Sequence, residues 1–305
     1  MERILAWLNH PLSSEGGIRL WMALGAGLVL LAAILIGAFL GRRARRRHKP
    51  PEPVTREPKK QPALELANLQ GMGMRAEQQD AFGMSPLDRY KENGLLAVLC
   101  DGMGGMAAGG AIAAETVAGL LGAFPWTDDG QTYQWIGQQS RRIYDGFRGQ
   151  GGTTLVAALL RGGRLWFWCV GDSDLFLLRQ GELYALHIPQ EYRYELALQA
   201  LEGGTSLEAA FLDPQAGALT EYIGKEAVTC RYTRVPLALE PEDTLLLCSD
   251  GVSDTLTRKQ LREALALPPQ AACDRLEEAI LAAGLAGQDN YTAIILRYHG
   301  EGEEI

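Results

Sequence analysis

The longest apolar stretch of the chain lies near its start. Leu20–Leu40 contains twenty-one residues without a charge. At about 1.5 Å per residue, a helix of this length matches the roughly 30 Å hydrocarbon core of a bilayer. The stretch is apolar on every face, whereas a helix buried in a globular core seldom is. We therefore predict a transmembrane helix at residues 17–41.

A basic segment, residues 42–49, follows this stretch directly. Positive charge concentrates on the cytoplasmic side of a membrane, so residues 1–16 are expected to form a short extracytoplasmic tail. A cleaved signal peptide would carry its basic residues before the apolar run. Prolines and charges at residues 42–63 predict an extended cytoplasmic linker. The pattern indicates a single-pass protein of the inner or plasma membrane, with the part of the chain that follows the linker in the cytoplasm.

Residues 64–300 alternate between short apolar runs and amphipathic stretches, which predicts one α/β or α+β domain. The apolar runs predict buried strands at Leu95–Cys100, Leu165–Val170, Leu175–Leu178, Thr244–Cys248 and Thr292–Arg297. Helical periodicity predicts helices at Gly109–Gly122, Gln134–Phe147, Arg258–Ala266 and Gln270–Ala283. Residues 187–218 show helical periodicity without strand alternation, and we expect them to form one or two helices inserted over the sheet.

Charge and cysteine content narrow the class of function. The whole chain carries a net charge of −8, but residues 1–49 hold eight basic and two acidic residues, which leaves −14 on the remainder. Nucleic-acid binding requires a basic footprint, so this acidic body argues against it. The five cysteines show no zinc-type spacing, and none has an arginine six positions later, as a cysteine-dependent phosphatase requires. They are expected to be buried, reduced thiols.

Four aspartates stand at the predicted ends of strands. Asp101, Asp172 and Asp250 each close an apolar run and precede a small residue, while Asp289 comes just before the last run. A single Asp-Gly pair is ordinarily only a turn. Four carboxylates on the rim of one sheet structure are the arrangement of a metal or substrate site. Oxygen ligands without histidine favour magnesium, manganese or calcium.

Two further residues extend this candidate site. Gly102 allows close approach of the backbone, so its carbonyl can serve as a ligand. Arg75, five residues before Asp80, can grip a phosphate with two hydrogen bonds, although a lone arginine is more often a solvated surface residue. Two divalent ions sharing a carboxylate can activate a bridging water for attack on phosphorus.

Six short motifs, in order, resemble the metal-dependent protein phosphatases of the PPM (type 2C) family, especially its bacterial members. They are Arg75–Asp80, Asp101–Gly105, Gly152–Thr154, Val170–Ser173, Ser249–Asp254 and Asp289–Thr292. The resemblance covers roughly residues 65–298. It implies an α+β fold, a four-layer α-β-β-α sandwich, with a site for two Mn²⁺ or Mg²⁺ ions at one end.

The resemblance also implies a role for each matching residue. The residues that would hold metal are Asp80, Asp101, Gly102, Asp172, Asp250, Asp254 and Asp289. Among these, Asp101 would bridge the two ions, and Asp172 and Asp254 match positions that hold a third, weaker ion. Asp80 and Arg75 would be the catalytic residues, the first supporting metal-bound waters and the second orienting the substrate phosphate.

The resulting prediction is a membrane-anchored phosphatase that hydrolyses phosphoserine and phosphothreonine in proteins and opposes a serine/threonine kinase. A membrane-tethered pseudophosphatase that binds phosphoproteins or scaffolds a complex is the alternative. Asp172-Ser-Asp174 also resembles the start of haloacid-dehalogenase phosphatases, in which the first aspartate is a nucleophile. Gln78, Asp174 and residues 187–218 depart from the type 2C pattern.

Overall fold

The computed structural model describes residues 62–103, 108–126 and 129–300. All described elements belong to one compact unit, Lys60–Ile305. The predicted tail at 1–16, the predicted transmembrane helix at 17–41 and nearly all of the linker lie outside the described residues. Within the described part, no helix is long and apolar enough to cross a membrane.

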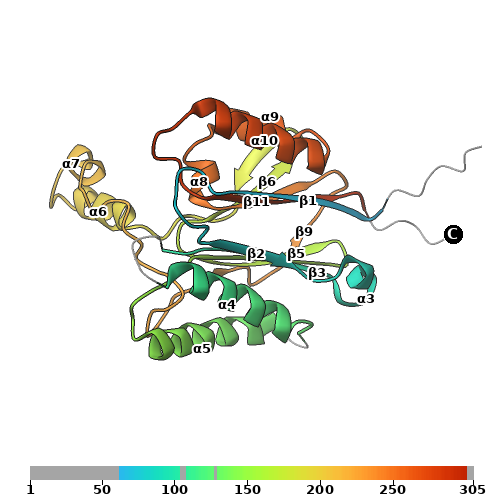
Figure 1. The fold of residues 1–305 in the computed structure, drawn as a ribbon, viewed down its shortest axis with the longest axis horizontal. Helices are drawn as coiled ribbons and strands as arrows, with labels where there is room; N and C mark the ends of the chain where they lie inside the picture. Colours follow the sequence, from blue (N-terminus) through green and yellow to red (C-terminus); the bar gives the residue numbers. More distant parts are fainter. Residues whose placement is uncertain (1–61, 104–107, 127–128, 301–305) are drawn as a thin grey trace, which may run out of the picture. The chain divides into compact units, whose positions relative to one another are not determined.

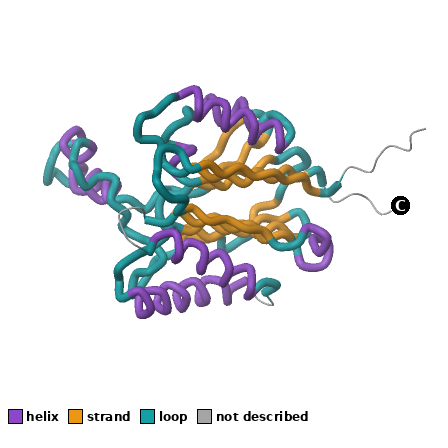
Figure 2. Tube along the Cα trace, in the orientation of Figure 1, coloured by secondary structure: helices purple, strands orange, loops and turns teal. Residues whose placement is uncertain are grey.

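Two antiparallel sheets form the centre of this unit (Figures 1 and 2). The first sheet has the order β1 (Leu64–Gly71), β11 (Tyr291–Tyr298), β10 (Thr244–Cys248), β6 (Asp174–Arg179) and β7 (Glu182–Ala185). The second sheet has the order β2 (Asp80–Met84), β3 (Leu95–Asp101), β4 (Leu155–Arg161), β5 (Arg164–Val170) and β8 (Arg231–Tyr232), and β9 (Leu237–Ala238) also pairs with β5. A 3₁₀ turn, η1 (Leu87–Arg89), and the short α3 (Tyr90–Asn93) connect β2 to β3.

The central strands are apolar at most positions because both faces of each sheet are covered. In β3, alternate residues such as Leu95 and Leu99 pack between the sheets, while Leu96 and Val98 face the helices. In β11, Ile294 faces the other sheet and its neighbours face α9 and α10. Successive residues of a continuous apolar strand point to opposite faces of the sheet, so one strand contributes side chains to two separate hydrophobic cores.

Helices cover the outer face of each sheet, so that the layers are helix, sheet, sheet and helix (Figure 1). Packed on the second sheet are α4 (Gly109–Ala123) and α5 (Asp129–Phe147). Packed on the first are α8 (Asp250–Ser253), α9 (Arg258–Leu265) and α10 (Pro269–Ala283). A capping box of Thr257 and Gln260 begins α9. The predicted strands and helices are confirmed, with their ends shifted by up to a few residues, and so is the α+β architecture of two sheets flanked by helices.

The predicted position of the insertion is wrong. Residues 187–218 do contain two helices, α6 (Tyr192–Leu201) and α7 (Leu207–Phe211). Figure 1 shows that they project from one end of the sandwich and do not lie over a sheet. They pack on each other through Leu196 and Ala210, and Ala216 from the segment after α7 joins this cluster. Helical periodicity reveals an apolar face, but not which surface covers it.

Candidate active site

One end of the sandwich gathers the aspartates that stand at strand ends. Asp101 is the last residue of β3, Asp172 follows β5, Asp250 begins α8 after β10, and Asp289 precedes β11. Since β3 and β5 both run antiparallel to β4, they finish at the same edge. Likewise, β10 ends where its antiparallel partner β11 begins. All four aspartates line one cavity of about 120 Å³, as Gly102 and Thr154 do.

The Gly-Thr-Thr segment holds the backbone of Asp101 in place. The Thr153 hydroxyl donates to the Asp101 carbonyl at 2.7 Å, and the Asp101 N–H donates to Thr154 Oγ1 at 2.9 Å. The Thr154 hydroxyl in turn shares a 2.7 Å hydrogen bond with that of Ser173. The Gly152–Thr154 and Val170–Ser173 motifs, to which the sequence analysis gave no role of their own, therefore help to position Asp101 at the centre of the site.

Asp80 lies behind the cavity, directly opposite Asp101 in the β2–β3 register. Its Oδ2 accepts hydrogen bonds from Ser249 at 2.9 Å and Thr292 at 2.7 Å. Its Oδ1 is buried without a protein partner. Burial raises the pKa of Asp80 to about 6, against the effect of the two hydroxyl donors. The site thus contains a rigidly held carboxylate with one oxygen unused by the protein.

The other carboxylates are also held in conditions that disfavour their charge. Burial, followed by the charges of Asp80 and Asp250, holds the pKa of Asp101 well above its usual range. Burial and then Asp250 raise the pKa of Asp172 to about 7. The pKa of Asp250 is raised mainly by burial, and its Oδ1 has no protein partner. A cluster of partly buried carboxylates that repel one another is the environment a divalent cation stabilises.

Asp289 is already engaged by another residue of the predicted site. Arg75 Nη2 lies 2.5 Å from Asp289 Oδ2, with the Arg75 side chain 51% exposed and the Asp289 side chain 38% exposed. This ion pair raises the pKa of the Arg75 guanidinium. Across the described residues, no three His, Cys, Asp or Glu side chains are arranged as a ready group for a metal ion. The donor types fit Mn²⁺ or Mg²⁺, and in the structure Arg75 occupies one acceptor position of the Asp289 carboxylate.

Gly102 is required by close packing of three backbone segments. A Cβ atom there would lie 2.5 Å from the carbonyl carbon of Gly109 and 2.6 Å from the carbonyl oxygen of Gln79. The Gly102 N–H donates to the same Gln79 carbonyl at 3.1 Å. The loop can therefore pass beside Asp101 only with glycine at this position. That the Gly102 carbonyl binds metal remains a prediction.

The two residues predicted to hold a third ion lie in adjoining cavities. Asp172 lines the cavity of Asp101, whereas Asp254 lines a second cavity of about 200 Å³ together with Asp250 and Asp289. Asp174, which departs from the family pattern, adds a further carboxyl group whose pKa burial raises to about 6. The charge of Asp254 contributes to that rise. This side of the site is more acidic than the resemblance implied.

Two residues of the insertion support the site and were missed by the sequence analysis. Gly171 donates its N–H to Gln190 Oε1 at 2.9 Å, and its carbonyl lies 2.9 Å from His187 Nε2. Gly171 has φ +93°, and a Cβ atom there would approach Thr154 to 2.9 Å. The stem of the insertion thus fixes the turn that presents Asp172. The only sign of this role in the sequence was that two polar residues, His187 and Gln190, stand at the start of a segment with the apolar periodicity of a helix.

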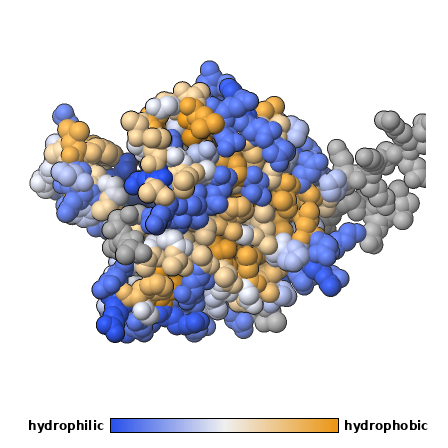
Figure 3. Space-filling view, viewed as in Figure 1, coloured by the Kyte–Doolittle hydropathy of each residue, from blue (hydrophilic) through white to orange (hydrophobic). Residues whose placement is uncertain are grey.

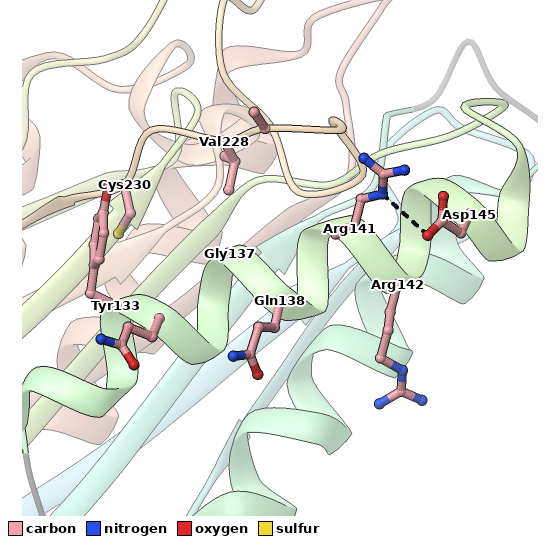
Figure 4. Close-up of a pocket in the computed structure, with 10 residues that line it drawn as sticks. Tyr133, Gly137, Gln138, Arg141, Arg142, Asp145, Val228 and Cys230 are labelled. Carbon is pink, nitrogen blue, oxygen red and sulfur yellow. Dashed lines mark hydrogen bonds and ion pairs between the residues drawn. The ribbon is translucent and has the colours of Figure 1, made fainter.

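A larger cavity, of about 530 Å³, lies elsewhere, between α5 and residues 227–230. Figure 4 shows Arg141 directed toward Asp145, while Gln138 and Arg142 point away from Val228 and Cys230. Its polar groups neither converge nor include the aspartates described above. Cavity size is therefore a poor guide here, and the small acidic cavity is the candidate active site.

Comparison with known proteins gives a consistent picture. Residues 74–288 match the family model described as protein phosphatase 2C. The serine/threonine protein phosphatase PstP of Mycobacterium tuberculosis is 33% identical over 216 residues, which cover 66% of this chain and only 40% of PstP.

Two solved structures are similar in fold. The serine/threonine phosphatase of S. agalactiae has a TM-score of 0.65 and 26% identity, covering 77% of this chain and 99% of that one. The catalytic domain of a PstP, solved in complex with two manganese ions, has a TM-score of 0.58 and 27% identity. It covers 77% of this chain and 97% of that one.

Proposed function

The chain belongs to the protein phosphatase 2C family, and we propose that it removes phosphate from phosphoserine and phosphothreonine in proteins. The observation that carries this proposal is the cavity lined by Asp101, Asp172, Asp250 and Asp289. Its oxygen-only donors suit Mn²⁺ or Mg²⁺, and its volume of about 120 Å³ suits a small group such as a phosphoryl group. Membership of this family argues against the haloacid-dehalogenase alternative, which requires a phosphorylated aspartate.

Family members of this kind use two Mn²⁺ or Mg²⁺ ions, and here we infer that Asp101, the Gly102 carbonyl, Asp250 and Asp289 would hold them. Asp172 and Asp254 would contribute to a third, weaker site. When bound, such ions supply a nucleophilic water at neutral pH and neutralise charge on phosphoryl oxygens.

The protein's own groups then have distinct tasks. Arg75, once released from Asp289, presents a planar guanidinium that can donate two hydrogen bonds to a phosphate. Asp80 lies opposite Asp101 in the β2–β3 register, and its unpaired Oδ1 is the atom available to accept a hydrogen bond from water. Ser249 and Thr292 keep the Asp80 carboxylate fixed during this task.

The Arg75–Asp289 ion pair is the observation that favours the pseudophosphatase alternative, because the guanidinium competes with a metal ion for the Asp289 carboxylate. The deciding experiment measures turnover of p-nitrophenyl phosphate and of a phosphothreonine peptide by the full chain with Mn²⁺. Asp101→Asn and Asp250→Asn should each abolish turnover, while the exposed Asp88→Asn should retain it. A folded, unmutated chain that is inactive with every divalent metal tried would establish the pseudophosphatase.

We further propose that residues 17–41 anchor the enzyme in the inner or plasma membrane, with the phosphatase domain in the cytoplasm. The support is the uncharged Leu20–Leu40 stretch and the arginines that follow it. The substrates would be phosphoproteins near the membrane, and a serine/threonine kinase would oppose the enzyme. Protease added to intact spheroplasts should leave the domain uncut and protease added to inverted vesicles should cut it. The reverse pattern would refute the orientation.

A further inference from the structure

An apolar groove lies beside the candidate active site. It has a volume of about 470 Å³ and runs between the β1–β2 loop and the C-terminal end of α10. Met72 and Met74 form one wall and are 50% and 68% exposed, while Leu281 and Leu285 form the other and are 67% and 49% exposed. Figure 3 shows hydrophobic surface gathered where α10 ends. Large apolar side chains grouped in this way commonly mark a binding surface.

The two walls of the groove are firmly connected. The Met74 N–H donates to the Gln288 carbonyl at 2.8 Å, and Asn290 Nδ2 donates to the Met72 carbonyl at 2.9 Å. Between them, Gly73 has φ +58°, and a Cβ atom there would lie 2.2 Å from the Asp289 carbonyl oxygen. The exposed methionines therefore sit on a docked loop, and the groove is formed before any ligand arrives.

The groove is continuous with the active site through the second cavity. That cavity shares Asp250 and Asp289 with the catalytic cavity, and Leu285 and Gln288 with the groove. Arg75, which pairs with Asp289, directly follows Met74 in the chain. A peptide whose phosphate contacts Arg75 would therefore pass directly into the groove.

We propose that this groove binds a hydrophobic side chain of the phosphoprotein, a few residues from the phosphorylated serine or threonine. The inference rests on the proposed phosphatase function and adds a selectivity to it. None of the residues that line the groove is charged, so a charged side chain would lose its hydration there without gaining a partner. Methionine walls adapt to different shapes, which favours Leu, Ile, Met and Val alike.

The test uses the full chain loaded with Mn²⁺ and a set of phosphothreonine peptides. Each peptide carries one Leu at a different distance from the phosphothreonine, on a background of Ser, Gly and Gln. At one distance the Leu should raise kcat/KM by about tenfold, the gain expected for a partly buried Leu side chain. The double variant Leu281→Gln/Leu285→Gln should lose this gain and keep its rate on p-nitrophenyl phosphate.

Leu201→Gln is the matched control, because Leu201 is an exposed leucine (73%) at the end of α6. It should keep the selectivity for Leu. If Leu201→Gln abolishes the selectivity and the double variant does not, the insertion recognises the substrate and the inference is wrong. The inference is also wrong if no peptide is preferred. It is wrong as well if the double variant keeps the selectivity for Leu and changes only the oligomeric state measured by sedimentation, because the groove would then be a contact between copies of the chain. Failure of every substrate, p-nitrophenyl phosphate included, would instead reject the proposed phosphatase function.

Discussion

Replacing Asp172 with Asn should make the metal-free protein more stable at neutral and alkaline pH. Burial raises the pKa of this carboxyl from 3.8 to about 7. A carboxyl whose pKa is raised on folding favours the folded state most below pH 3.8, where it is protonated in both the folded and the unfolded chain. This contribution to the free energy of unfolding is lost as the pH rises from 3.8 through 7. Between pH 5 and pH 8 the loss amounts to about 2.5 kcal/mol, at 1.36 kcal/mol per pKa unit.

Thermal unfolding in EDTA at pH 5, 6, 7 and 8 measures this effect. A difference of about 2.5 kcal/mol corresponds to about 5–10 °C in Tm for a domain of this size. The gain of Asp172→Asn over the unmutated chain should therefore be larger by that amount at pH 8 than at pH 5. The exposed Asp88→Asn is the control and should follow the unmutated chain. If the Tm of Asp172→Asn and that of the unmutated chain change with pH in parallel, the reasoning that this carboxyl is removed from water and has no cationic partner is refuted.

Three further outcomes are expected. Ser249→Ala removes a donor to Asp80 Oδ2, so Mn²⁺ affinity measured by calorimetry should fall about tenfold, and unchanged affinity would show that this support is dispensable. Gly102→Ala places a Cβ atom against the Gly109 backbone and should lower the free energy of unfolding in urea by about 1–3 kcal/mol, whereas full stability would mean that the loop moves freely. Arg75→Ala frees Asp289, so KM for a phosphopeptide should rise while Mn²⁺ affinity is kept or improved; a matching loss of Mn²⁺ affinity would contradict the role of Arg75 in binding phosphate.

Five of the eleven described strands and the longer helices could be predicted because their patterns are local, whereas strands such as β1 and β4 were not predicted. Strands such as Thr244–Cys248 are continuous apolar runs, and helices such as α10 show a face that repeats about every 3.6 residues. The aspartates could be assigned to one rim for a related reason. A residue at the end of a buried strand lies at the rim of the sheet formed by the strand ends, whatever the order of the strands.

The support of the site was harder to predict because it joins residues far apart in the chain. Thr292 and Asp80 are separated by 212 positions, yet they form a 2.7 Å hydrogen bond. His187 and Gln190 hold Gly171 from within a segment that was expected to cover a sheet. Neither contact leaves a periodic trace in the sequence, since each depends on how the strands are ordered in the two sheets.

The sequence by itself therefore determined about half of the helices and strands, the acidic character of the site and the type of metal it favours, since these depend on residue type and local periodicity. Only the tertiary structure decided which charges meet. It paired Arg75 with Asp289, 214 positions away, and so joined a predicted phosphate ligand to a predicted metal ligand. It also brought Met72 and Met74 beside the end of α10 to form a groove. Such contacts arise from packing of distant segments, and packing is a property of the folded chain.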